Sequence, residues 1–434
     1  MHVYRTSKAP RGGLLVSLFT LILCAQFGCD ALPLGGLGGT QDGDLTSGGI
    51  AGSIKEDGDN SAFELAQSAT VALGQTVTIQ GRLDSRTDID LYSLGPATAG
   101  ERITIEVTGD NGFNTVAALF DGNNDLIDAN DDRSYYGGDV NPYISRVIRH
   151  DTPNLFVGVA VSSTAHFGNN VGRYDGGTYT ISAKRETSTY MPEPRKQIVY
   201  LDFSGGALVQ IGLEPIVTMR PFSAESISSR LSGDTNYLID LCVDHMKRDF
   251  ADFDVEIRDS RHHSKPTEPH STVYFGNYNA KYLGLADNVD TYNTYLEQEA
   301  IVYTEDLANY EGLFPSAEEV GQCMANIGSH ELGHLLGLEH SRDPLDCMAT
   351  AATARQIIEN DLTFRRSLMQ SDVFPIGYQN EPRLLTWNIG RNPNANTARM
   401  SVEDLLPAKG ANFRDELGIA DIPIVPCGRC THAH

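Results

Sequence analysis

The sequence predicts a multidomain protein in which an N-terminal all-β sandwich precedes an α+β domain. The chain has 434 residues, which is more than one ordinary hydrophobic core accommodates. Over residues 61–187, short runs alternate apolar and polar side chains, with Gly, Asp and Asn between them. Over residues 196–395, strand-like runs are interspersed with segments of helical period. We therefore expect the sandwich over 61–187 and the α+β domain over 196–395.

The strands of the first domain are predicted from period-2 alternation. Thr76–Ile79, Arg102–Val107 and Gly177–Ile181 each alternate in this way, and their spacing favours a sandwich of two sheets. The run Asp121–Asp125 has residue types found in calcium loops, but Leu126 stands where an EF-hand requires Gly. A hairpin turn is the favoured interpretation. Calcium binding stays open as an alternative because further carboxylates follow at Asp128, Asp131 and Asp132.

The second domain begins with Gln197–Phe203, which has the pattern of a buried strand. Ala300–Tyr303 is predicted to be the strand nearest a substrate cleft, where a peptide could add as an extra strand. Ala354–Met369 is predicted to be a helix late in the domain. The remaining elements are a helix over Ile239–Phe250 and strands over Val255–Ile257 and Thr272–Phe275.

The most informative run is His330-Glu331-Leu332-Gly333-His334-Leu335-Leu336-Gly337-Leu338-Glu339-His340. His330 and His334 are four residues apart, so on a helix they share one face and can bind one metal ion. Gly337 allows the chain to leave the helix in a left-handed conformation, which returns His340 to the same point. Three imidazoles then leave one tetrahedral position for water, with Glu331 beside it as the base. The pattern indicates hydrolytic chemistry.

A helix start is visible upstream of this run. Pro315 precedes Ser316, and Glu319 follows three residues later, which is the pattern of a capping box. Apolar residues then recur at helical spacing as far as Gly337, namely Val320, Met324, Ile327 and Leu335. The sequence thus predicts a helix of about 20 residues that ends in the metal site.

The histidine run resembles the metzincin zinc peptidases, whose pattern is H-E-x-x-H-x-x-G-x-x-H followed by a Met-turn. Among them the matrixins are the most similar, because Ser341, Asp343 and Met348 stand at matching intervals. The resemblance implies a zincin catalytic domain, with Met348 as a hydrophobic floor under the zinc ion. It also implies that Asp343 ties the Met-turn to the active-site helix. Thr350 departs from the astacin and serralysin pattern, which places a metal-binding tyrosine there, so three protein ligands are expected.

The first domain resembles the bacterial pre-peptidase C-terminal domain. Asp88–Leu94 is similar to its opening signature, and Gly177–Tyr179 to its closing one. Between these two signatures, Ala118–Gly122 and Asn154–Val159 also match the pattern of this domain family. The resemblance implies a non-catalytic sandwich that accompanies a secreted peptidase.

The N-terminus has the features of an export signal over residues 1–29. Basic residues precede an apolar run, Leu14–Phe27, that is too short for a typical membrane span. Gly28-Cys29 is similar to the end of a lipobox, so Cys29 is a candidate lipidation site, with plain secretion as the alternative. A flexible tether is expected over residues 30–60, a linker over 188–195 and a C-terminal tail over 396–434.

Seven cysteines are present, and in an exported protein they are disulfide candidates. Cys323 precedes His330 by seven residues, which on a helix places it on nearly the same face as the ligands. Cys347 directly precedes Met348, which the metzincin resemblance places beneath the metal against that face, so a Cys323–Cys347 bridge is predicted. Cys242 is the rival partner for either residue. Cys427 and Cys430, in the tail, have metal-ligand residue types but favour a local disulfide or an untethered end.

Other candidate cation sites are weaker. His262, His263 and His270 lie among Ser, Lys and Pro, which favours a solvated loop over a second metal site. Asp287 and Asp290 are candidates for calcium beside the predicted edge strand.

The formal net charge of −24 argues against a basic patch for nucleic acid or an anionic membrane. Membrane association is expected only through a lipid at Cys29. The expected function is an exported zinc endopeptidase that acts on proteins or peptides, in the cell envelope or outside the cell. The alternative is a surface protein that binds a polymer or another protein and keeps a vestigial zinc site. The presence of Glu331 argues against this alternative, because a binding module needs no such carboxylate.

Overall fold

The computed structural model describes residues 50–133, 138–162, 175–212, 214–313, 315–350 and 352–395. These residues belong to one compact unit. The export signal, Cys29 and the C-terminal tail with Cys427 and Cys430 lie outside the described residues, so the predictions made for them stay predictions. Within the described residues, no helix is both long and apolar enough to cross a membrane.

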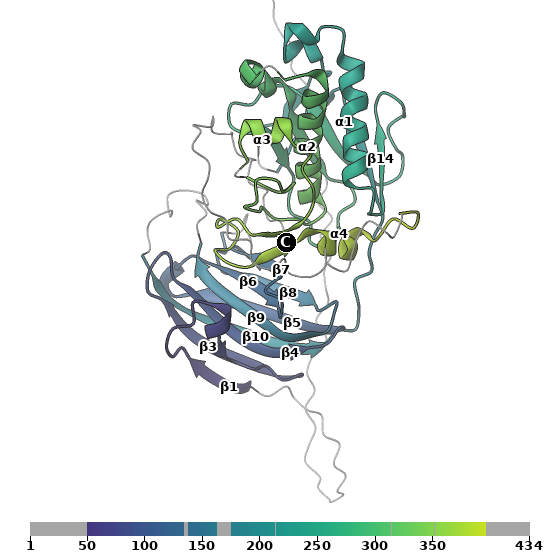
Figure 1. Ribbon diagram of the computed structural model, residues 1–434. Coiled ribbons are helices and arrows are strands. Elements are labelled where there is room, and N and C mark those ends of the chain that lie inside the picture. The colour runs from purple at the N-terminus through teal and green to yellow at the C-terminus, as the bar shows by residue number, and fades with distance from the viewer. Residues whose placement is uncertain are drawn as a thin grey trace, which may run out of the picture. The chain divides into compact units, whose positions relative to one another are not determined.

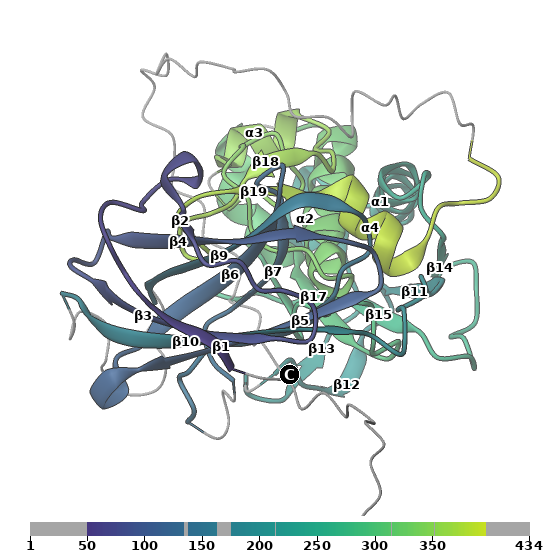
Figure 2. The same ribbon diagram turned by 90° about the horizontal axis from the view of Figure 1, so that it is seen from below.

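Two five-stranded sheets face each other in the first domain (Figures 1 and 2). An apolar core lies between them, with Ile79 and Ile181 from one sheet and Leu119 and Val157 from the other. The first sheet has the order β1 (Ile50–Lys55), β3 (Thr76–Leu83), β10 (Gly177–Thr187), β5 (Glu101–Gly109) and β8 (Tyr143–Val147). The second has the order β2 (Gln67–Ser68), β4 (Ile89–Ala97), β9 (Thr152–Val161), β6 (Thr115–Asp121) and β7 (Leu126–Asn130).

Two local predictions for this domain have different outcomes. The turn Asp121–Leu126 is the hairpin between β6 and β7, and the Asp121 side chain accepts the backbone N–H of Asp125. The prediction of a tether as far as residue 60 is wrong for β1, which pairs in parallel with β3. Ile54 packs against the sandwich core, and the paired sheet edge orders a segment whose polar composition indicated flexibility.

A five-stranded mixed sheet organises the second domain, in the order β14, β11, β15, β17 and β16. Val302 faces the helices α1 and α2, which lie side by side on one face of the sheet (Figure 1), and Ile301 faces the β12–β13 hairpin on the other. The strand bounds are β11 (Gln197–Asp202), β12 (Gly206–Val209), β13 (Val217–Met219), β14 (Val255–Asp259), β15 (Ser271–Gly276), β16 (Gly284–Ala286) and β17 (Glu299–Tyr303). The helices are α1 (Thr235–Asp249) and α2 (Ala317–Leu335).

The predicted position of Ala300–Tyr303 at the edge of the sheet is wrong. These residues belong to β17, which is an inner strand, because β16 pairs antiparallel with it. Gly284 lies opposite Val302 in this pairing. β16 is therefore the edge strand, and its three residues are too short to give a clear period-2 signal in the sequence.

The predicted helix Ala354–Met369 is also wrong beyond Glu359. α3 spans only Ala354–Glu359, and the chain then forms β18 (Arg366–Leu368), β19 (Tyr378–Asn380) and α4 (Glu381–Ile389). The side-chain amide of Asn326, which is buried on α2, donates to the carbonyls of Ile357 and Asn360. These hydrogen bonds end α3. Five short 3₁₀ segments complete the described elements: Phe63–Leu65, Asp110–Gly112, Ala224–Ser226, Ser229–Leu231 and Thr304–Leu313.

Candidate metal centre

The helix α2 carries the first two candidate ligands, and its start matches the sequence prediction. Ser316 is the N-cap, and its hydroxyl accepts the backbone N–H of Glu319. The Glu319 carboxylate accepts the backbone N–H of Ser316 at 2.7 Å, which completes the capping box. The helix then continues through His330 and His334, which lie one turn apart on the same face.

Three histidine nitrogens converge at the end of α2. The Nε2 atom of His334 lies 3.2 Å from Nε2 of His330 and 3.1 Å from Nε2 of His340. The three ligand atoms lie within 4.8 Å of one another, and all three side chains are buried. Tetrahedral zinc with Zn–N bonds of about 2.0–2.1 Å would separate its nitrogens by roughly 3.3 Å. His330, His334 and His340 therefore form a group that fits a metal ion.

Backbone carbonyls fix the orientation of two of these rings. Nδ1 of His330 donates to the carbonyl of Cys347 at 2.8 Å, and Nδ1 of His334 donates to the carbonyl of Leu338 at 2.7 Å. A carbonyl only accepts, so the proton of each neutral ring is on Nδ1 and the lone pair is on Nε2. Burial also lowers the pKa of His330 to about 4, which keeps this imidazole neutral. Both features suit metal coordination.

Gly337 forms the predicted turn between the helix and the third histidine. Its φ is 93°, and the backbone N–H groups of Gly337 and Leu338 donate to the carbonyls of His334 and Gly333. This is the Schellman pattern of hydrogen bonds. A Cβ at Gly337 would also lie 2.8 Å from the carbonyl oxygen of Asp290. The position thus requires glycine both for its conformation and for its space.

Glu331 is buried beside the histidines, and the edge strand β16 passes close to it. A Cβ at Gly284 would lie 2.2 Å from Oε1 of Glu331 and 2.6 Å from its Cδ. Gly284 therefore leaves the space that the Glu331 carboxylate occupies. Gly284 was not among the residues predicted from the sequence, although a glycine within a strand is a signal of close approach.

Met348 lies against α2 in the loop that follows His340. Its backbone carbonyl accepts the N–H of Ser341 at 2.9 Å, which closes the loop. The side chain is fully buried, and a Cβ at Gly333 would lie 2.5 Å from the Met348 sulfur. The thioether therefore packs against the helix between the positions of its two histidines.

Asp343 does not make the contact with the helix that was expected of it, and a different aspartate supports the Met348 loop. Asp343 accepts the N–H of Leu345 and pairs with Arg365 at 3.3 Å, so its carboxylate serves the loop itself. Asp346, fully buried, accepts the N–H of Met348 at 2.9 Å and a hydrogen bond from the Ser367 hydroxyl. Asp343 is partly exposed at the surface of the loop, where it forms an ion pair with Arg365. Of these two aspartates, only Asp346 points into the interior.

Asp346 is paired with a second buried carboxyl, Glu381 at the start of α4. Burial raises the pKa of Asp346 and raises that of Glu381 further, and the proximity of the two groups adds to the effect at Glu381. Gln379 donates to Glu381 at 3.0 Å and to the carbonyl of Glu339 at 2.7 Å. Glu381 and Gln379 could not be found from the sequence, because no local pattern places them under the Met348 loop.

The predicted Cys323–Cys347 disulfide is wrong. Cys242, Cys323 and Cys347 are all free, buried thiols. Cys347 is level with His330, because its carbonyl binds that ring. Cys323 is seven residues earlier on α2, which is about 10 Å along the axis and beyond disulfide reach. A shared helix face would not bring the two residues together, because the axial distance separates them.

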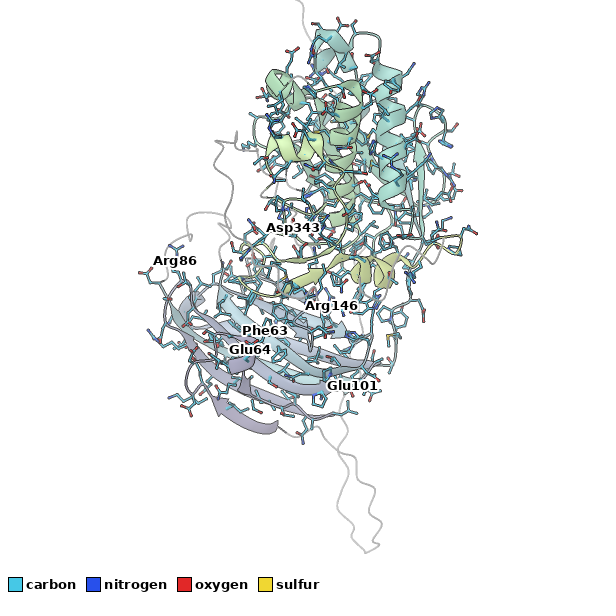
Figure 3. All side chains as sticks on the ribbon, in the orientation of Figure 1. Phe63, Glu64, Arg86, Glu101, Arg146 and Asp343 are labelled. Carbon is cyan, nitrogen blue, oxygen red and sulfur yellow. The ribbon has the colours of Figure 1, made fainter. Side chains whose placement is uncertain are left out.

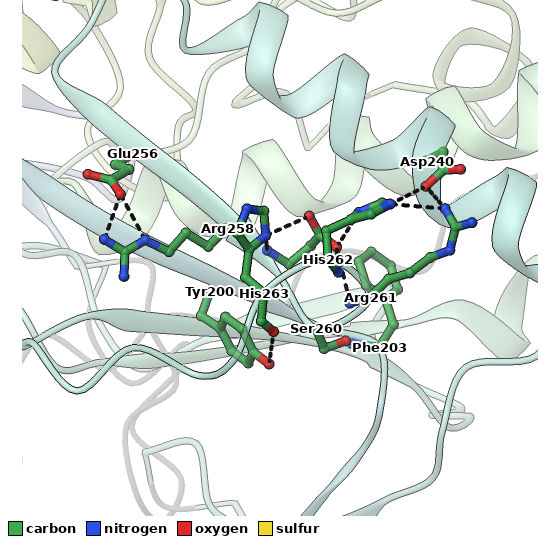
Figure 4. A network of polar contacts seen from close by, with 10 residues as sticks. Tyr200, Phe203, Asp240, Glu256, Arg258, Ser260, Arg261, His262 and His263 are labelled. Carbon is green, nitrogen blue, oxygen red and sulfur yellow. Dashed lines mark hydrogen bonds and ion pairs between the residues drawn. The ribbon is translucent and has the colours of Figure 1, made fainter.

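His262, His263 and His270 lie between β14 and β15, and Figure 4 shows His262 and His263 within a network of polar contacts. Nδ1 of His262 lies 2.9 Å from Asp259, and Nδ1 of His263 lies 3.3 Å from it. His270 instead bonds the carbonyl of Glu268. His262 and His263 are exposed, so the three rings belong to a polar surface loop, as the favoured interpretation had it.

The calcium candidates are engaged by protein donors. Asp287 accepts the backbone N–H of Gly212 and that of Glu299, and Asp290 accepts those of Thr294 and Tyr295. Asp121 and Asp125 are paired with arginines, and Asp128 is paired with Arg146 at 2.8 Å. These contacts give the carboxylates structural roles and do not support a calcium site.

A buried trio of histidines with an adjacent carboxylate thus defines the centre. No protein-family model matches the chain, and no curated protein matches it. Among solved structures, a pre-peptidase C-terminal domain of collagenase from Bacillus anthracis is 16% identical, covers 27% of this chain and 96% of its own, and has a TM-score of 0.19. Archaemetzincin from Methanopyrus kandleri is 14% identical, covers 39% and 89%, and has a TM-score of 0.23. These TM-scores are too low for either likeness to indicate the function of this chain.

Proposed function

We propose that the chain is a zinc-dependent endopeptidase of the matrixin-like metzincin type. The observation that carries the proposal is the convergence of three Nε2 atoms around His334, with Glu331 buried next to them. Zinc is the metal that this donor set favours, because three neutral imidazoles leave one tetrahedral position open. Calcium and magnesium take oxygen ligands and do not suit this site.

A zinc ion held by His330, His334 and His340 would lower the pKa of a bound water and polarise the scissile carbonyl. Glu331 accepts the proton of the attacking water and delivers it to the leaving amine. His330 and His334 are held in one tautomer by the carbonyls of Cys347 and Leu338, so their lone pairs need no reorganisation. Met348 fills the space against α2 beneath the centre.

The substrate is a protein or peptide, and the edge strand β16 is where its backbone would align. Gly284, Leu285 and Ala286 make up this strand, and β17 occupies its other side. An extended peptide could therefore pair with the free edge as a further strand and pass beside Glu331. Export is part of the proposal, because the N-terminal run resembles a signal with a lipobox-like end at Cys29. The protein would then act in the cell envelope or as a secreted enzyme.

The test is cleavage of casein by the purified chain, with and without a zinc chelator. We expect cleavage that the chelator abolishes and that added zinc restores. Zinc bound at about one equivalent without any cleavage of casein or of a mixed peptide library would contradict the peptidase assignment. It would favour the alternative of a surface-binding protein with a vestigial site.

A further inference from the structure

The outer face of the second sandwich sheet is apolar, and a segment of the α+β domain covers it. Phe120 and Phe156 of the sheet belong to the same buried cluster as Met369 and Phe374. The rings of Phe120 and Phe374 are 5.6 Å apart in an edge contact. A Cβ at Gly158 would lie 2.7 Å from Phe374, so glycine makes room for this ring. The sheet therefore has a core on each side, one of them shared with the α+β domain.

A buried charge cluster lies beside this apolar contact. Asp125, in the hairpin of the sandwich, pairs with Arg366 at 2.6 Å and with Arg383 at 2.9 Å. Arg383 also pairs with Asp121 at 2.9 Å, and Asn380 donates to Asp125 at 3.2 Å. The carboxylates are almost fully buried, with side-chain exposures of 0% and 2%. Removing one member would leave a buried charge without its partner, so the cluster fixes the relative position of the segments that it joins.

Residues 366–374, which these contacts hold, are hydrogen-bonded directly to the third histidine, His340. The backbone N–H of Gln370 donates to the carbonyl of His340 at 3.0 Å, and that of Arg342 donates to the carbonyl of Leu368 at 2.9 Å. Phe374 in turn donates its N–H to the carbonyl of Gln370. The backbone of His340 is therefore hydrogen-bonded to a segment that packs its apolar side chains, Met369 and Phe374, against the sandwich.

A second connection leads from the sandwich to the turn at Gly337. Tyr292 lies under the guanidinium groups of Arg146 and Arg149, at 4.9 and 4.6 Å, and its hydroxyl accepts the N–H of Val147 (Arg146 is labelled in Figure 3). Its φ of 132° lies in the region that side chains rarely adopt, so the surroundings must hold it there. The neighbouring Asp290 donates its N–H to the carbonyl of His334.

We propose that the sandwich is a positioning element of the metal centre, which sets the place of His340 through Asp125, Arg366 and Phe374. The inference rests on the proposed function, because it takes His340 as a ligand. None of the three residues reaches the metal, so they act through the backbone of residues 366–374. The sandwich is then part of the catalytic unit and more than an accompanying binding domain.

The experiment uses the full chain with zinc and compares three variants. Asp125→Asn changes no volume but removes the charge that faces Arg366 and Arg383. Phe374→Leu keeps an apolar side chain but loses the ring contact with Phe120. Glu186→Gln is the matched control, because it breaks an exposed pair with Lys184 on the other sheet of the sandwich.

The readouts are the zinc dissociation constant, from competition with a chelator, and the visible spectrum of the cobalt-substituted protein. We expect Asp125→Asn and Phe374→Leu to weaken zinc binding about 10- to 100-fold, as outer-shell changes do, and to alter the cobalt spectrum. Glu186→Gln should leave both unchanged. These measurements are made at a temperature at which circular dichroism shows every variant to be folded.

Two outcomes would overturn the inference. In one, Asp125→Asn and Phe374→Leu lower the melting temperature but keep the wild-type zinc affinity and cobalt spectrum, which means a structural role alone. In the other, Glu186→Gln weakens zinc as much as they do. Failure of the proposed function is distinguishable, since it appears in the wild type as absent zinc or as zinc without hydrolysis.

Discussion

The candidate metal centre has two halves that are built by different means. One half is the helix α2, which supplies His330, Glu331 and His334 within five consecutive residues. The other half is the loop region from His340 onward, which includes Met348 and extends to α4 at Glu381. Capping, helical period and a glycine turn determine the first half locally. The second half has little regular structure and depends on residues far away in the sequence.

This difference indicates which part of the centre is sensitive to the rest of the fold. A helix keeps the i, i+4 geometry of two ligands wherever it is placed. A loop has no such internal geometry, so the position of His340 is set by what it is bonded to. Its carbonyl binds Gln370, in a segment packed on the sandwich, and the loop closes between Ser341 and Met348. Perturbations of the two halves should therefore have different consequences.

Loss of a ligand is expected to have the largest effect in either half. The wild type should retain about one zinc after dialysis, and His334→Ala and His340→Ala should each retain almost none, because two imidazoles do not complete the site. Peptide hydrolysis should fall below detection in both. Atomic absorption measures the metal. His270→Ala, which changes a half-buried ring bonded to a carbonyl away from the candidate centre, is the control. Stoichiometric zinc in either ligand variant would show that the ligand is wrongly assigned.

Removal of Glu331, the proposed base, should separate binding from chemistry within the helical half. Glu331→Ala should keep the fold and the zinc but lower kcat/KM by about 10²- to 10⁴-fold, which is the scale of acid–base catalysis. Steady-state kinetics on a fluorogenic peptide measure the change, and the zinc content is determined on the same sample. Turnover near that of the wild type would exclude the role given to Glu331.

Crowding of the base should give an intermediate effect. Gly284→Ala places a Cβ 2.2 Å from Oε1 of Glu331, and the flexible carboxylate will move while the helix stays in place. We expect kcat to fall about 10- to 100-fold with zinc content unchanged, because a displacement of about 1 Å has consequences of that size. Gly312→Ala is the control, because nothing lies within 4 Å of its Cβ. Equal kinetics for the two variants would show that Gly284 leaves no space that the base requires.

The smallest effect is a pH dependence confined to the loop half. Burial raises the pKa of Glu381 and of Asp346, so the folded protein binds more protons than the unfolded chain. The stabilisation is complete below the ordinary carboxyl pKa of about 4 and is lost as pH rises through the raised values. Glu381→Gln removes one of these groups and should reduce the fall in melting temperature between pH 5 and pH 8 by roughly 2–4 °C. Differential scanning calorimetry measures it. Glu64→Gln, at an exposed site, should match the wild type, and an unchanged slope in Glu381→Gln would contradict the argument.

The same division separates what the sequence predicted well from what it did not. The capping box at Ser316, the turn at Gly337 and the convergence of the three histidines follow from intervals of a few residues, and the structure has all of them. The helix predicted to extend to Met369 and the Cys323–Cys347 bridge both fail beyond that range. In each case a pattern that holds over a few residues was applied to residues farther apart, and it does not determine their positions.

The sequence by itself determined the two-domain order, the helical half of the centre and the donor types that favour zinc, because periodicity, caps and short spacings act within one element. Only the tertiary structure decided that β16 is the edge strand, that Asp346 and not Asp343 supports the Met348 loop, and that the sandwich faces the α+β domain. Strand order, carboxyl pairs and shared cores join residues tens to hundreds of positions apart. Asp125 and Arg366 are 241 residues apart, and no local pattern encodes their contact.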